Sequence, residues 1–174
     1  PGLPGAHNHQ NACAAYAVCR TLGLAPRVIE AGLASFAGLP HRSQVIAKTG
    51  GVSYVNDSKA TNGASTAPAL AAYPRVHWIV GGLPKTDNLD ECIPNFGHVV
   101  KAYTIGEAGL LFHELLSPHL PVERCEMMGT AVYSAAAQAQ PGDVIMLSPA
   151  CASFDQFKDF EARGDAFRAI VGAL

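Results

Sequence analysis

The sequence has little charge and few aromatic side chains. Charged residues make up 15% of the 174 positions and aromatic residues 7%, and the formal net charge is −2. A chain with so small a surplus of either sign lacks the basic surface that nucleic acids and anionic membranes require. The composition therefore argues against a nucleic-acid-binding protein and favours small-molecule ligands.

Long apolar runs and leader-like features are also missing. No apolar run approaches the roughly 20 residues that a membrane-spanning helix needs. The first ten residues, PGLPGAHNHQ, have neither the basic flank nor the apolar stretch of a signal peptide. We therefore expect a cytoplasmic protein without membrane insertion. Because the chain opens on Pro1 and runs at once into a polar loop and a helix, we also expect it to be part of something longer.

Metal-binding and disulfide patterns are absent as well. The five cysteines are odd in number and widely scattered, in apolar surroundings rather than in paired metal spacings. We expect reduced thiols in the core. They are Cys13, Cys19, Cys92, Cys125 and Cys151. His7 and His9 lie one residue apart but have no third ligand nearby, so we predict no metal site.

Two helices are predicted at the start of the chain. The alanine-rich stretch NACAAYAVCRTLG suits a buried helix that stops at Gly23, where a left-handed cap is expected. Pro26 can begin a second helix, in which Ile29, Leu33 and Phe36 recur at helical spacing. Residues 1–38 should therefore form a helical pair.

The remaining residues alternate short apolar strands with turns and alanine-rich helices. VSYVN, HWIVGG, KAYTIG, VERCE and VIML are the strands, and the chain ends in a helix over FKDFEARGDAFRAIVGAL. This alternation predicts an α/β fold. Nearly continuous apolar strands such as VIML predict a mainly parallel sheet that helices cover on both faces.

Ligands of open α/β sheets bind beyond the carboxyl ends of the strands, which directs attention to the loops NDSKATN, GGLPKTD, IGEAG and SPACASFDQF. The first loop places Asp57, Ser58, Lys59 and Thr61 between a strand and a helix start, where backbone N–H groups and the helix dipole favour an anion. The alternative is a helix N-cap followed by a surface lysine.

The loop GGLPKTD resembles the tail of a phosphate-binding P-loop, with Lys85 and Thr86 in the last two places. A P-loop needs glycine at the positions that Ile79 and Pro84 occupy, and proline has no N–H to donate. Lys85 is therefore either a lone cation that reaches across a cleft or a solvated surface lysine.

The last loop supplies Ser148, Cys151, Ser153 and Lys158 around a helix start, and its hydroxyl and amide groups could hold a carboxylate. A nucleophile elbow is the rival interpretation, but G-x-S-x-G is absent and the sequence shows no base for the serines or the thiol. Earlier in the chain, residues 39–42 (LPHR) suit a hinge whose arginine swings toward a phosphate, or a linker with a tethering salt bridge.

Five segments in succession resemble the signatures of the Mur ligase family: GAHNHQNACAA, GLPHR, YVNDSKATN, the GG-x-x-K turn and LSPACASFDQFKDFEARG. Their order and spacing match over essentially the whole chain. HN-x-x-N, HR and ND-x-KAT are shared by several members, whereas SPACASFDQF with F-x-x-RG is typical of the branch that adds D-glutamate. The resemblance implies that residues 1–38 are the helical tail of a central ATP-binding domain and that residues 39–174 form a Rossmann-like D-glutamate-binding domain.

The resemblance also implies the chemistry. Family members use ATP and magnesium to activate the carboxylate of UDP-N-acetylmuramoyl-L-alanine as an acyl phosphate, and the nitrogen of D-glutamate then displaces phosphate in peptidoglycan precursor synthesis. The family's phosphate-binding lysine, its magnesium ligands and its UDP-binding domain all precede the stretch that this chain resembles. We therefore expect no catalytic residue in this chain and no ligase activity from it alone.

Ten residues correspond to family positions that contact ligands. Those implied for the nucleotide are Asn8, Asn11, Arg42 and Asp57. Those implied for D-glutamate are Lys59, Thr61, Lys85, Ser153, Phe154 and Phe160. The chemistry fits, because a dicarboxylic amino acid needs cations and N–H donors for its carboxylates while its amine stays free. The proline of GGLPKTD departs from more flexible turns in the family and could shift Lys85.

Two other functions stay open. The chain could belong to a related ligase that adds L-alanine, a diamino acid or, on folate, glutamate. It could also be a binding module that senses an acidic metabolite without catalysis.

Overall fold

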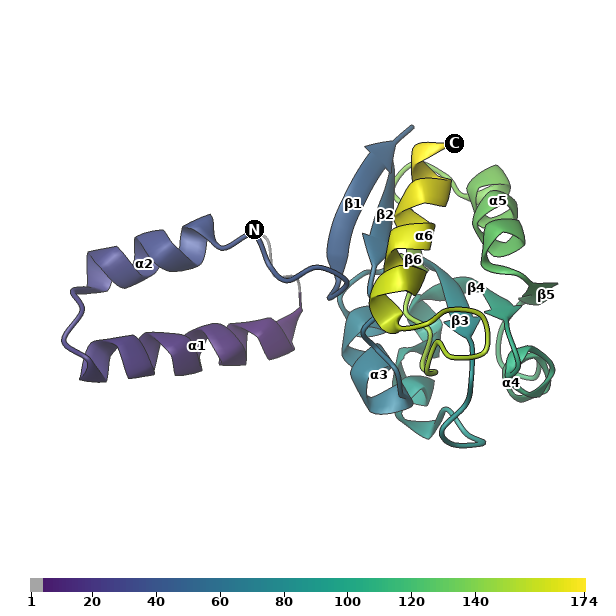
Figure 1. Cartoon of the computed structure of the whole chain (residues 1–174), viewed down its shortest axis with the longest axis horizontal. Coiled ribbons are helices and arrows are strands. Elements are labelled where there is room, and N and C mark those ends of the chain that lie inside the picture. The colour runs from purple at the N-terminus through teal and green to yellow at the C-terminus, as the bar shows by residue number, and fades with distance from the viewer. Residues whose placement is uncertain (1–4) are drawn as a thin grey trace.

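The computed structural model describes residues 5–174, without the side chains of Ala6 and His7. The side chain of His7, one of the two histidines considered above, thus lies outside the described part. Two antiparallel helices come first, α1 (Ala6–Thr21) and α2 (Pro26–Ser35), and they stand apart from the rest of the chain (Figure 1). Among the described residues, no helix has the length and apolar character needed to cross a membrane.

The two helices end and begin as predicted. Gly23 has a φ of 86°, and its N–H donates to Arg20 O at 3.0 Å while the N–H of Leu24 donates to Cys19 O at 3.1 Å. These two bonds satisfy the last carbonyl groups of α1. Pro26 occupies the first turn of α2, where a missing N–H leaves no helical bond unmade.

The prediction that the first helix is buried was wrong. Most side chains of α1 are exposed, because the helix packs against α2 and away from the sheet (Figure 1). Cys13 is accordingly exposed and Cys19 is partly buried, so only the other three cysteines are core thiols. All five are free.

A six-stranded sheet forms the body of the protein, in the order β1-β2-β6-β3-β4-β5. Strand β1 pairs antiparallel with β2, and all other neighbours are parallel, which confirms the mainly parallel sheet. The strands are β1 (Gln44–Thr49), β2 (Val52–Asn56), β3 (Val76–Gly81), β4 (Val99–Ile105), β5 (Val122–Glu126) and β6 (Val144–Leu147).

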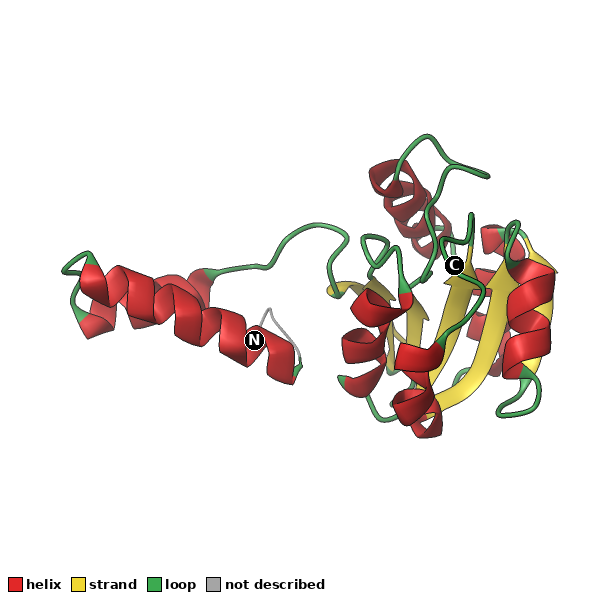
Figure 2. Ribbon diagram, turned by 90° about the horizontal axis from the view of Figure 1, so that it is seen from below, coloured by secondary structure: helices red, strands yellow, loops and turns green. Residues whose placement is uncertain are grey.

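Helices cover both faces of this sheet, as expected (Figure 2). On one face Trp78, Leu70 and Phe112 belong to one apolar cluster, and on the other Ile79 and Phe167 belong to a second. Full burial of each such side chain contributes about 1.5–3 kcal/mol. The first face carries α3 (Gly63–Ala71), the 3-10 helix η1 (Asp90–His98) and α4 (Gly109–Leu116), and the second carries α5 (Met128–Gln138) and α6 (Phe160–Gly172).

Strand β1 and helix η1 were not predicted. Strand β1 has an irregular burial pattern, so no alternation of apolar and polar residues marks it. Its hairpin to β2 has Gly50 and Gly51 at φ values of 59° and 81°, and two central residues with positive φ are typical of two-residue hairpins. The Gly-Gly pair was therefore the available signal for the extra strand.

The strand order places three loops beside one another. The chain passes from β2 through β3 and β4 to β5 over one face, then returns over the other face through α5 to insert β6 between β2 and β3. The helix after β6 consequently lies on the face opposite to the helices after β2 and β3. Such a reversal opens a crevice at the carboxyl ends of the strands, where ligands of α/β sheets bind.

Candidate functional site

The loops that follow β2, β3 and β6 are joined by backbone hydrogen bonds. Leu83 N–H donates to Ala152 O at 2.9 Å, and Ala152 N–H donates back to Leu83 O at 3.0 Å. On the other side of β6, Asp57 N–H donates to Leu147 O at 2.8 Å. The three loops therefore form one connected edge of the sheet.

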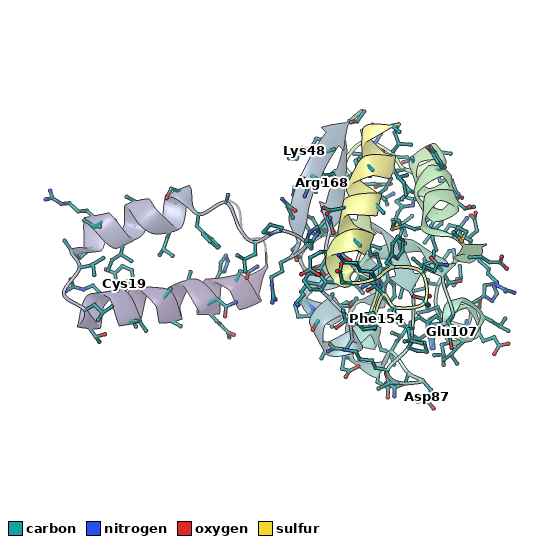
Figure 3. The ribbon with its side chains drawn as sticks, in the orientation of Figure 1. Cys19, Lys48, Asp87, Glu107, Phe154 and Arg168 are labelled. Carbon is teal, nitrogen blue, oxygen red and sulfur yellow. The ribbon has the colours of Figure 1, made fainter. Side chains whose placement is uncertain are left out.

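The fourth loop, after β4, joins the same edge. Asp155 Oδ2, in the loop after β6, accepts a 3.0 Å hydrogen bond from the backbone N–H of Glu107. Figure 3 shows Glu107, Phe154 and Asp87 gathered at this end of the domain, whereas Lys48 and Arg168 lie away from it. All four loops singled out in the sequence thus meet in space.

A cavity of about 380 Å³ lies between the helical pair and the sheet domain. Its volume falls at the lower end of the range for small-molecule sites, roughly 300–1,000 Å³. Asn8 and Asn11 line it from α1, Arg42 lines it from the connecting segment, and Asp57 and Lys59 line it from the loop after β2. The four residues implied for the nucleotide therefore surround one cavity. The rest of its lining is Phe36, Leu39, Ser43, Ala60, Ser65, Pro68 and Ala69.

Asp57 is the buried carboxylate of this cavity, with only 6% of its surface exposed. Its Oδ1 accepts the N–H of Ser43 at 2.8 Å, and its Oδ2 accepts the hydroxyl of Ser148 at 2.7 Å. Burial raises the pKa of Asp57 to about 6, against the opposing effect of these hydrogen bonds and of the Arg42 charge. The carboxylate is thus held in one orientation at the floor of the cavity.

The connecting segment is fixed to the sheet domain from His41 onward. His41 is buried, its carbonyl accepts the N–H of Lys59 at 3.0 Å, and its Nδ1 lies 3.2 Å from Asn56 Nδ2. His41 and Ser43 have φ values of 61° and 42°, a conformation that non-glycine residues rarely adopt. Arg42 therefore stands between two residues that the sheet domain holds.

Gly164, on α6, makes room for His41. A Cβ atom at Gly164 would lie 2.1 Å from His41 Nδ1. The carbonyl of Gly164 also accepts a 2.9 Å hydrogen bond from Asn56 Nδ2. The connecting segment, β2 and α6 therefore meet at a contact that no larger residue at position 164 fits.

The residues implied for D-glutamate form two pairs. Lys85 Nζ donates to Thr61 Oγ1 at 3.2 Å, which joins the loops after β3 and β2. Lys59 Nζ lies 3.7 Å from the centroid of the Phe160 ring, a cation–π contact that orients the ammonium group without neutralising it. Lys59 lines the cavity described above, whereas Lys85 lines a second, shallower hollow beside Thr86.

The two remaining residues of that set lie in the loop after β6. Ser153 is 2% exposed, and its carbonyl accepts the N–H of Phe157 at 2.8 Å. Phe154 is 68% exposed at the surface of the same loop (Figure 3). The structure thus buries Ser153 in the loop and leaves the neighbouring ring accessible to a ligand or to another surface.

The buried thiol of the same loop is not a nucleophile. Burial raises the pKa of Cys151 to about 12, so the thiolate that would react is scarce at neutral pH. Ser148, the first serine of the loop, is fully buried beneath Asp57, so a substrate does not reach its hydroxyl. Both observations agree with the rejection of a nucleophile elbow.

Sequence reasoning missed Arg163, which is only 1% exposed. Its guanidinium group donates to the carbonyl and the hydroxyl of Ser58 and to the carbonyls of Cys151 and Ala152. Two signals were available: Arg163 is the arginine of the F-x-x-RG signature, and it precedes Phe167 by four positions and so shares the buried face of α6.

Comparison with known proteins identifies a family and several relatives. The family model described as "Mur ligase, glutamate ligase domain" matches residues 41–151. A UDP-N-acetylmuramoylalanine--D-glutamate ligase of Novosphingobium aromaticivorans is 66% identical over 174 residues, which are 100% of this chain and 39% of that protein. One of Cereibacter sphaeroides is 60% identical, over 100% of this chain and 37% of that protein. The chain thus spans about two fifths of the length of these curated relatives.

Solved structures share the fold at lower identity. The UDP-N-acetylmuramate-alanine ligase of Thermotoga maritima superposes with a TM-score of 0.70 at 14% identity, covering 98% of this chain and 39% of that one. The E. coli FolC protein in complex with DHPP and ADP superposes with a TM-score of 0.66 at 22% identity, covering 94% and 39%. These likenesses extend over the helical pair as well as the sheet domain.

Proposed function

The chain belongs to the Mur ligase family with its glutamate ligase domain, and we propose that it is the D-glutamate-binding part of an ATP-dependent ligase of peptidoglycan precursor synthesis. The complete enzyme would form an amide between UDP-N-acetylmuramoyl-L-alanine and D-glutamate. This choice of amino acid is supported by the name of relatives that are 55–66% identical over the whole chain, since they are D-glutamate ligases. The likeness to FolC, at 22% identity, supports only the fold.

The observation that carries the proposal is the cavity between the helical pair and the sheet domain. It collects two amides from α1, a cation from residues 39–42, and a second cation and a buried carboxylate from the loop after β2. Ligand pockets often form where two domains meet, with a few polar groups that fix orientation. We accordingly assign residues 1–38 to a central ATP-binding domain and residues 39–174 to the amino-acid-binding domain.

The polar lining of the cavity fits one side of ATP. The amides of Asn8 and Asn11 can pair with a base, Asp57 can accept a hydrogen bond from a ribose hydroxyl, and the exposed Arg42 can pair with a phosphate. ATP, when bound, supplies the phosphoryl group that activates the carboxylate to be joined. This chain's own contribution is to hold and orient, since Asp57 is already fixed by Ser43 and Ser148.

D-glutamate would be held by charges that the protein does not neutralise. Among the ion pairs of the described residues, neither Lys59 nor Lys85 takes part. Lys85 is bonded to the neutral hydroxyl of Thr61, and Lys59 rests over the ring of Phe160. Both ammonium groups are therefore available to the carboxylates of an acidic amino acid, while Ser153, which is buried in the loop after β6, lies outside both hollows.

The described residues do not fit a magnesium site. Within residues 5–174, apart from the two omitted side chains, no three His, Cys, Asp or Glu side chains gather closely enough to hold a metal ion. We therefore assign no magnesium ligand to the described residues of this chain. We propose that the 174 residues alone release no phosphate from ATP. They provide the binding site for the attacking amino acid but only one side of the nucleotide site.

An assay of the full-length protein that carries this chain tests the function. Phosphate release from ATP in the presence of UDP-N-acetylmuramoyl-L-alanine should require D-glutamate. L-Alanine, a diamino acid and L-glutamate with a folate are the comparison substrates. Preference for any of them, or equal rates without D-glutamate, would contradict the proposal. The 174-residue chain, assayed in parallel, should show no release.

A further inference from the structure

Arg163 joins two loops of the proposed D-glutamate site from beneath. Its Nε and Nη2 donate to Ser58 Oγ and Ser58 O at 3.0 and 2.8 Å, in the loop after β2. Its Nη1 and Nη2 donate to Ala152 O and Cys151 O at 3.1 and 3.0 Å, in the loop after β6. Ser58 precedes Lys59, and Ala152 precedes Ser153, so one side chain touches the neighbours of both binding groups.

This contact is unusual because the cation has no anionic partner. Within the described residues Arg163 forms no ion pair, and its four hydrogen-bond acceptors are neutral. Burial lowers the pKa of Arg163 to about 10, against the opposing effect of the Asp155 charge. A buried cation without an ion-pair partner destabilises a fold, whereas an apolar residue at the same place would not. A role in shaping the loops explains why a guanidinium group stands there.

The loop after β3 closes over the same group. A Cβ atom at Gly82 would lie 3.1 Å from Arg163 Nη1 and 2.4 Å from Ala152 O. Position 82 therefore admits only glycine while the guanidinium and the Ala152 carbonyl keep their places. All three loops that carry residues implied for D-glutamate thus meet around Arg163.

We propose that Arg163 is a positioning residue of this site: its guanidinium group sets the separation between Lys59 and Ser153 and thereby the fit of D-glutamate. The proposal rests on the proposed function for the identity of the ligand. Asp57 is held independently, by Ser43, Ser148 and the carbonyl of Leu147. A change at Arg163 should therefore affect the amino-acid site more than the nucleotide site.

Lysine cannot replace arginine in this position. The guanidinium group is a planar fork with five donors, and four hydrogen bonds to two loops use that shape. A lysine ammonium group is a compact point charge with three donors and cannot span both sets of carbonyls. Arg163→Lys keeps the positive charge but loses the hydrogen bonds that join the two loops. It therefore tests the shape of the side chain separately from its charge.

The test compares Arg163→Lys with wild type in the full-length ligase. We expect kcat/KM for D-glutamate to fall about 10- to 100-fold, mainly through KM, because displacements near 1 Å have effects of this size. KM for ATP should stay unchanged. Ser58→Ala removes the hydroxyl that accepts from Arg163 Nε and donates to Phe160 O, but keeps the other three hydrogen bonds of Arg163. It should give a smaller rise in the KM for D-glutamate, and it serves as the test if Arg163→Lys does not fold.

Arg168→Lys is the matched control, because Arg168 lies on the same helix but is exposed, where it contacts Gln44. It should leave both KM values unchanged. An unchanged KM for D-glutamate in folded Arg163→Lys or in Ser58→Ala would overturn the proposal. Parallel rises in both KM values would also overturn it, since they indicate general loosening.

A second readout separates this proposal from the proposed function. If the wild-type enzyme does not use D-glutamate, the proposed function is wrong. Hydrogen exchange still tests whether Arg163 holds the loops in place, because it needs no ligand. The amides of Leu83, Ala152 and Lys59 hold the loops in place and should exchange faster in Arg163→Lys than in Arg168→Lys. Equal exchange in the two variants would refute the positioning role.

Discussion

Replacement of Asp57 by asparagine should stabilise the sheet domain at neutral pH. Burial raises the pKa of this carboxyl from 3.8 to about 6, although hydrogen bonds from Ser148 and Ser43 oppose the rise. A difference of this size corresponds to about 3 kcal/mol by which the folded protein disfavours the ionised form. Asparagine keeps the acceptor for the Ser43 N–H and offers an amide donor to the Ser148 hydroxyl, without the charge.

The pH dependence of stability follows from the direction of the shift. Because the pKa of Asp57 is higher in the folded state than in the unfolded state, the folded protein binds this proton more tightly. Its contribution to stability is complete below about pH 4 and is lost as the pH rises through about 6. The contribution of Asp57 to the wild-type free energy of unfolding should thus fall by about 3 kcal/mol over this interval, and Asp57→Asn should lack that part of the slope.

Urea unfolding measures both effects. The one tryptophan of the chain, Trp78, is fully buried in the sheet and donates to Ser148 O at 2.7 Å, so its fluorescence reports unfolding close to the site. Asp87→Asn, at an exposed position, is the control and should follow wild type (Figure 3). A wild-type stability that does not change between about pH 4 and pH 7, or an Asp57→Asn variant less stable than wild type at neutral pH, would refute the reasoning.

Two further predictions concern packing and thiol exposure. Gly164→Ala should lower the free energy of unfolding by about 1–3 kcal/mol, because its Cβ would displace the buried His41 ring. Gly172→Ala, with open space around the added Cβ, is the control and should not lower it. Thermal unfolding of the two variants measures the difference. In the 174-residue chain a thiol reagent at mild alkaline pH should modify the exposed Cys13 rapidly. The three buried thiols should react slowly, because burial raises the pKa of Cys92, Cys125 and Cys151 to about 12. Equally rapid modification of the buried thiols would contradict the fold.

The fold could be predicted from the sequence where local pattern and burial coincide. Nearly continuous apolar strands such as VIML gave the parallel sheet, and Gly23 and Pro26 marked the ends of helices because backbone geometry restricts those positions. The exposure of α1 could not be predicted, since alanine is equally compatible with a buried and an exposed helix. Strand β1 was not predicted, because an edge strand with irregular burial shows no alternation of apolar and polar residues.

The sequence also indicated which loops lie together at one end of the sheet, because the carboxyl ends of parallel strands share one edge. It could not indicate which loops touch. That depends on the insertion of β6 between β2 and β3, which pairs Val144 with Ser53 and with Val76, both far away in the sequence. The contact of Lys85 with Thr61 and that of Lys59 with Phe160 follow from this long-range order and not from any local spacing.

The insertion of β6 accounts for both anchors of the site. Because β6 borders β2, its end brings Ser148 and the carbonyl of Leu147 to Asp57, at the floor of the cavity. Because α6 then covers the opposite face from α3, Arg163 reaches the loops after β2 and β6 from that face. The proposed nucleotide side and the proposed amino-acid side are thus supported by different residues of the same last βα unit, residues 144–172. Substitutions within this unit can therefore alter one side and leave the other intact.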